Sequence, residues 1–135
     1  MAKVQRITHF KITLEDKPGA LLAIAKGLKG KNTSLVGLKA LESQPGKSAA
    51  YLIPRNADKL RSTLKSLGLA FEEGTSLFVK GTDKTGALIK SLEAIAGAGV
   101  NIRATDAIAI GGNYGAFFRV ASADLEKAAA ALGAK

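Results

Sequence analysis

The sequence contains two copies of one motif, and this repeat constrains the fold more than any other feature. Residues 16–21 (DKPGAL) align with residues 83–88 (DKTGAL), and five of the six positions are identical. Three further matches follow in the same order: residues 30–32 with 99–101, residues 46–51 with 112–117, and residues 57–58 with 123–124. Because the offset drifts only between 66 and 69, each half of the chain is expected to form the same structural unit.

Each copy has the pattern strand, helix, strand, strand, helix. Apolar residues alternate along the predicted strands and recur every three or four positions along the predicted helices. In the first copy, strands are predicted at 7–14, 35–41, 49–53 and 69–72, with helices near 18–30 and 60–67. In the second copy, strands are predicted at 76–80, 102–110 and 116–120, with helices near 88–96 and 125–132. Only residues 133–135 remain, so the second copy is expected to lack its last strand.

This order of elements predicts an α+β fold of two ferredoxin-like βαββαβ units, residues 1–74 and 75–135. Residues 71–76 form a link that is too short for a free linker. The two units are therefore expected to pack with pseudo-two-fold symmetry. A hairpin at Gly74 is one way to join the last strand of the first unit to the first strand of the second.

A strand followed by DKPGAL and an amphipathic helix ending in GKN or GVNI resembles the ACT domain family of regulatory amino-acid-binding modules. The first copy carries the family's Asp-x-Pro-Gly-x-Leu pattern, whereas the second has Thr85 in place of the proline. The resemblance covers nearly the whole chain, about residues 5–135. It implies a stand-alone tandem ACT protein with two ACT-like units and no catalytic domain.

The resemblance also implies a ligand site, held between two modules by the loop before the helix and by an asparagine after it. The residues carried over by position are Asp16, Gly19, Ala20 and Asn32 in the first copy, and Asp83, Gly86, Ala87 and Asn101 in the second. The chemistry agrees with this assignment. Glycine lets a ligand approach the backbone, a helix start attracts a carboxylate, and an aspartate accepts from an ammonium group.

A purely structural reading of the same residues stays open. Asp16 or Asp83 can cap the helix that follows, and a glycine there permits a tight turn. An asparagine after a helix is an ordinary residue of a left-handed turn. His9 is interpreted as a surface residue, because strict alternation places it opposite Phe10 and Ile12.

The formal charge of +9 favours an acidic partner or a polyanion, and residues 1–74 carry 13 of the 20 basic side chains. A basic nucleic-acid-binding protein is therefore the alternative function, with bases stacking on sheet aromatics. The basic-aromatic signature of such sheets is absent, which argues against it. The candidate aromatics are Phe10, Tyr51, Phe78, Phe117 and Phe118.

The sequence therefore predicts a non-catalytic regulatory protein that senses an amino acid and controls a separately encoded enzyme or pathway. One histidine and no cysteine offer no metal-binding cluster, and no cofactor is expected. No apolar run is long enough to cross a membrane and no signal peptide is recognisable, so the cytoplasm is the expected location. Exposed edges of the predicted sheets favour a homodimer.

Overall fold

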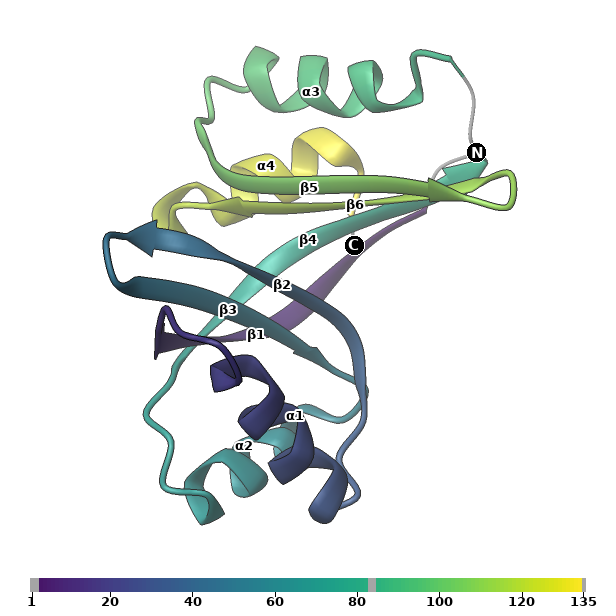
Figure 1. Ribbon diagram of the computed structural model, residues 1–135. Coiled ribbons are helices and arrows are strands. Elements are labelled where there is room, and N and C mark those ends of the chain that lie inside the picture. Colours follow the sequence, from purple (N-terminus) through teal and green to yellow (C-terminus); the bar gives the residue numbers. More distant parts are fainter. Residues whose placement is uncertain (1–2, 83–84, 135) are drawn as a thin grey trace. The chain divides into compact units, whose positions relative to one another are not determined.

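The structure is a computed structural model that describes residues 3–82 and 85–134. Helices and strands follow the predicted order, except that the two strands predicted at 69–72 and 76–80 form one strand and that a 3₁₀ turn is added (Figure 1). The strands are β1 (Lys3–Glu15), β2 (Leu35–Gln44), β3 (Lys47–Pro54), β4 (Glu72–Thr82), β5 (Ile102–Ile110) and β6 (Asn113–Val120). The helices are α1 (Ala20–Gly30), α2 (Ala57–Ser66), α3 (Ala87–Gly97) and α4 (Leu125–Leu132), with the turn at Ser122–Asp124. The predicted α+β class is confirmed.

The chain divides into two compact units, and both β1 and β4 contribute to each of them. The first unit is Thr8–Gly74, and the second combines the chain before Thr8 with the chain from Thr75 onward. The strand order is β2-β3-β1-β4-β6-β5. Within the second unit, the N-terminal part of β1 therefore lies beside β4, at the position that a fourth strand would take. No strand follows α4 among the described residues up to Ala134.

The segment around Gly74 differs from its prediction. A single strand, β4, runs from Glu72 to Thr82 without a hairpin, so the hairpin proposed at Gly74 is wrong. Glycine permits a turn but does not require one, and here a side chain at this position would be obstructed. A Cβ added to Gly74 would lie 2.8 Å from two atoms of the His9 ring.

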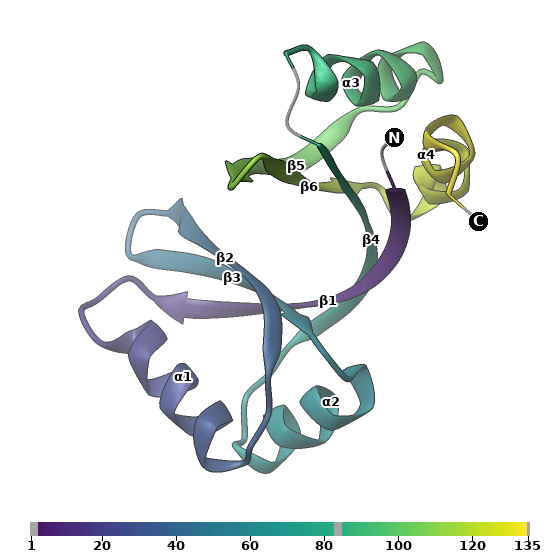
Figure 2. The same ribbon diagram turned by 90° about the vertical axis from the view of Figure 1, so that its right-hand side faces the viewer.

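In the first unit, α1 and α2 cover one face of the strands (Figure 2). Antiparallel pairing of β1 with β3 sets Phe10 opposite Leu52 and Ile12 opposite Ala50. These side chains are at most 2% exposed and meet the apolar stripes of both helices. Ile24 and Leu28 come from α1, and Leu60 and Leu64 come from α2. The spacing of these residues by three or four positions is the pattern that predicted the helices.

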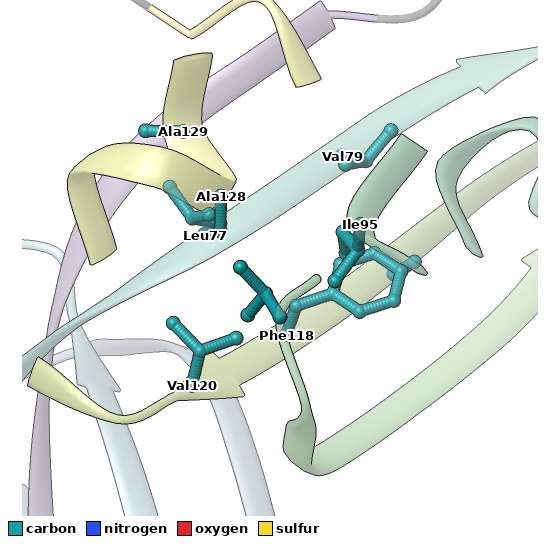
Figure 3. Close-up of a cluster of buried hydrophobic side chains, with 9 residues drawn as sticks. Leu77, Val79, Ile95, Phe118, Val120, Ala128 and Ala129 are labelled. Atoms are coloured by element: carbon teal, nitrogen blue, oxygen red, sulfur yellow. The ribbon is translucent and has the colours of Figure 1, made fainter. Parts of the chain in front are cut away.

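The second unit repeats this arrangement with α3 and α4. Leu77 and Val79 of β4 pack with Phe118 and Val120 of β6 under the two helices (Figure 3). Ile95 reaches the cluster from α3, and Ala128 and Ala129 reach it from α4. Val4 of β1 packs against the same cluster, which ties the first residues of the chain to the second unit.

Candidate functional site

A pocket of about 290 Å³ lies at the start of α1 in the first unit. It is bounded by the end of β1, the loop after it, the first turn of α1 and the second half of β2. Two of the four residues predicted for this copy, Asp16 and Ala20, line it. The full lining is Leu14, Glu15, Asp16, Lys17, Ala20, Leu21, Ala40, Leu41, Glu42 and Ser48.

A second pocket, of about 270 Å³, lies at the start of α3 in the second unit. Gly86 and Ala87, both predicted for this copy, line it. The remaining lining is Leu88, Ile89, Ala107, Ile108, Ala109 and Tyr114. Asp83, which is also predicted for this copy, lies outside the described residues.

The two pockets occupy equivalent positions in the repeat. Ala20 and Ala87 open the two helices, and the residues from Ala40 to Glu42 correspond to those from Ala107 to Ala109 at the same offset of 67. Their chemistry differs, because the first pocket adds three carboxylates, the Lys17 ammonium and the Ser48 hydroxyl to its apolar lining. Side chains of Leu, Ile, Ala and Tyr line the second. The sequence prediction found the loop residues but missed the strand residues that close each pocket. Aligning the second strands of the two copies at the offset of 67 could have indicated these strand residues.

Polar contacts organise the first pocket around Asp16. The Asp16 backbone N–H donates to the Gly46 carbonyl at 3.0 Å, and Ser48 Oγ donates to Asp16 Oδ1 at 3.3 Å. A hydrogen bond with Asp16, reinforced by repulsion between the two carboxylates, raises the pKa of Glu42 above its usual value. A positively charged group placed in this pocket would relieve that repulsion.

The loop glycines have a conformation that other residues rarely adopt. Gly19 and Gly86 have φ values of 86° and 84° and are themselves the N-cap residues of α1 and α3. Among the described residues, no side chain caps α1, so Asp16 is not the N-cap that the structural reading expected. In α1 the Ala20 N–H already donates to the Lys17 carbonyl at 3.3 Å. The N–H groups of Leu21 and Leu22, which have no partner within the helix, are the ones left for an anion.

The two predicted asparagines are not equivalent, contrary to the alignment at an offset of 69. Asn32 has φ 53°, and the Thr33 N–H donates to the Leu28 carbonyl. In the second unit, Gly99 has φ 74° and the Val100 N–H donates to the Ile95 carbonyl. Asn32 therefore corresponds to Gly99, and Asn101 takes the position of Ser34. The left-handed turn after the helix explains Asn32, since asparagine tolerates that conformation.

The structure does not bring the asparagine and the loop of one unit together. Asn32 lines a separate recess of about 350 Å³ at the far end of α1. Helix α1 has 11 residues, so its two ends are about 16 Å apart. Asn101 is exposed just before β5.

His9 is buried, so its assignment to the surface is wrong. Its side chain is 8% exposed, and its ring meets the Tyr51 ring edge-on at 5.8 Å between centroids. Alternation failed here because Tyr51 and Ala49 of β3 are buried on the face opposite Phe10 and Ile12. The described residues contain no group of three His, Asp or Glu side chains that could hold a metal ion. None of their helices is long and apolar enough to cross a bilayer.

The sequence matches no family model and no curated protein. Solved structures do match. Protein BT0572 from Bacteroides thetaiotaomicron superposes with a TM-score of 0.84 at 22% identity, over 96% of this chain and 88% of that one. The ligand-free regulatory subunit of aspartate kinase from Thermus thermophilus has a TM-score of 0.64 at 14% identity, over 98% and 94% of the two chains.

A third match is the crystal structure of E. coli aspartokinase III in complex with lysine and aspartate. Its TM-score is 0.56 at 17% identity, over 94% of this chain and 30% of that one. The chain therefore has the fold of aspartate kinase regulatory subunits, and the predicted tandem ACT-like fold is confirmed. At these identities, the likeness establishes the fold alone.

Proposed function

We propose that this chain is a non-catalytic regulatory protein that binds a free amino acid at the start of α1, of α3 or of both. The observation that carries the proposal is the pair of equivalent pockets, each at the start of a helix, where the first backbone N–H groups have no carbonyl partner within the helix. Such groups suit the carboxylate of an amino acid, and a pocket beside them suits its side chain. Structural neighbours include regulatory subunits of aspartate kinase, which supports a regulatory role.

The second pocket is proposed to take an amino acid with an apolar side chain. Leu88, Ile89, Ile108 and Tyr114 surround it, and burial of apolar ligand surface against them supplies the affinity. In the first pocket, Asp16 and Glu42 favour a ligand that carries a positive charge. Asn101 and Asn32 lie outside both pockets and are proposed to act only where another module is placed over them.

Thermal shift against the twenty amino acids at millimolar concentration tests this proposal. Binding to the folded state alone raises the melting temperature by mass action. We expect isoleucine, leucine or phenylalanine to raise it, and we expect Ala87→Leu to abolish that rise by filling the second pocket. Ala20→Leu tests the first pocket in the same way, with amino acids whose side chains carry a positive charge. These positions avoid the strain that any side chain meets at Gly19 or Gly86, where φ is positive.

Matched controls separate pocket filling from a general effect of leucine on a helix. Ala23 of α1 and Ala96 of α3 are exposed and line neither pocket. Ala23→Leu and Ala96→Leu are expected to keep the ligand response of the wild type. A panel in which no amino acid shifts the melting temperature would contradict amino-acid binding.

The proposed protein acts in the cytoplasm, as a homodimer, on a separately encoded enzyme. Nucleic-acid binding is not favoured, because stacking requires exposed rings. Four of the five candidate aromatics are at most 6% exposed: Phe10, Tyr51, Phe117 and Phe118.

A further inference from the structure

Four basic residues of the first unit lie at the end of α1 and at the start of α2, two segments that hydrogen bonds link. Lys29 and Lys31 lie at the end of α1, and Arg55 and Lys59 lie at the start of α2; all four are exposed. We call these four residues the basic corner. None of them makes an ion pair with another described residue.

Two hydrogen bonds hold the corner together. The Arg55 backbone N–H donates to the Ser34 carbonyl at 3.1 Å, next to the turn that follows Lys31. The Thr33 and Thr63 hydroxyls share a buried hydrogen bond of 2.7 Å, one helical turn from Lys59. The recess that contains Asn32 opens in the same corner, and Lys29, Leu28 and Leu35 are part of its lining. The corner therefore combines four cations with a recess that Lys29 lines together with both apolar and polar residues.

Helix stability does not explain this cluster. A cation near the end of a helix is favourable, which accounts for Lys29 and Lys31. Arg55 and Lys59, however, flank Asn56, the N-cap of α2, where positive charge opposes the helix dipole. Two of the four charges therefore cost a little stability where they stand.

The second unit carries no such corner. The equivalent positions hold Ala96, Ala98, Ala121 and Leu125, none of them charged. The two units share fold, pockets and core arrangement, so a requirement of the fold would have appeared in both. A surface that serves only solubility normally mixes both signs of charge, whereas Asp58, the acid that precedes Lys59 in the sequence, is engaged by Arg61 at 2.7 Å.

We propose that the basic corner docks an acidic segment of a partner protein, with carboxylates over the four cations and an apolar side chain in the recess. Complementary charge of this kind steers association and selects the partner. The proposal identifies the contact surface for the controlled enzyme in the proposed function, and it holds whether or not an amino acid binds.

Binding of fluorescent poly-L-glutamate to the intact protein, followed by anisotropy at several salt concentrations, tests the corner. The test variant carries Lys29→Gln, Lys31→Gln, Arg55→Gln and Lys59→Gln. The control variant carries the same loss of charge elsewhere, at the exposed residues Lys65, Lys80, Lys90 and Lys127. We expect about tenfold weaker binding for the corner variant, since four partly exposed pairs combine to roughly that factor, and a change within about twofold for the control.

Equal losses in both variants would overturn the proposal, because they would show only the attraction of a basic protein for any polyanion. Tighter binding of a 20-base-pair DNA duplex, with the same dependence on the corner, would overturn it in favour of nucleic acid. A double variant, Arg55→Gln with Lys59→Gln, guards against misfolding, since it removes charges that oppose the dipole of α2. It is expected to fold at least as stably as the wild type and to weaken poly-L-glutamate binding. Failure of this test leaves the amino-acid response untouched, so the two proposals fail separately.

Discussion

The pairing of Asp16 with Glu42 is the clearest electrostatic feature of the first pocket. The pKa of Glu42 is raised in the folded protein, so ionised Glu42 opposes folding at neutral pH, and this opposition disappears as the pH falls through the raised value. We therefore expect Glu42→Gln to raise the melting temperature at pH 7, and we expect the gain to vanish towards about pH 4. Differential scanning fluorimetry between pH 7 and about pH 4 measures the difference in melting temperature between the variant and the wild type.

Glu93→Gln on α3 is the control for that measurement, because it removes an exposed carboxylate from the other unit. An equal gain in both variants would mean that net charge, and not the contact with Asp16, governs the effect.

The carboxylates also explain why the site could be predicted only in part. DKPGAL marks the loop, but Glu42 enters the pocket from β2, and no local pattern connects the two.

At the scale of elements, the N-terminal part of β1 completes the second unit across more than a hundred residues of sequence. Arg6 Nη1 lies 2.7 Å from Glu126 Oε2 on α4, and a hydrogen bond from Arg6, with its charge, lowers the pKa of Glu126. A lowered carboxylate pKa stabilises the fold above the usual glutamate range and loses that contribution as the pH falls through the lowered value. Arg6→Gln is thus expected to lower the melting temperature at pH 7, and this effect is expected to shrink as the pH falls below about 4.

Lys3→Gln, an exposed change in the same strand, provides the control and is expected to have little effect at either pH.

Hydrogen exchange adds a second test through Val4, which packs on the core of the second unit. Val4→Ala is expected to cost up to about 1 kcal/mol and to speed exchange in α4 and β6. Faster exchange in α1 and α2 instead would contradict this assignment, because it would mean that the N-terminal part of β1 stabilises the first unit.

The order of elements could be predicted because the repeat displays each element twice. The errors fall where partners are distant in sequence. The alternation around Phe10 predicts one buried face, yet His9 is buried against Tyr51 of β3. No strand follows α4 among the residues described, and nothing near α4 in the sequence indicates that β1 lies beside β4 instead. Gly74 was interpreted as a turn because the fit of the His9 ring against it is not visible in sequence.

At the scale of the whole molecule, the edge strands β2 and β5 predict self-association. Five large apolar side chains on them are 46–72% exposed: Val36, Leu38, Leu41, Ile108 and Ile110. Exposed apolar edges favour pairing with another chain, and a lysine on an edge opposes it. We expect light scattering after size exclusion to give twice the chain mass of 13.9 kDa, and Ile110→Lys or Val36→Lys to reduce it. A monomer at tens of micromolar, with and without amino acid, would rule the dimer out.

NMR can detect an amino acid bound at the start of α1 or α3 residue by residue. The experiment titrates isoleucine, leucine and phenylalanine, each to about ten millimolar, into uniformly ¹⁵N-labelled protein. We expect saturable shifts of the amides of Gly86, Ala87, Ile108 and Tyr114, and we expect these shifts to be lost in Ala87→Leu but not in Ala96→Leu. Unchanged spectra with every amino acid, or shifts confined to residues outside both pockets, would contradict amino-acid binding at these helix starts.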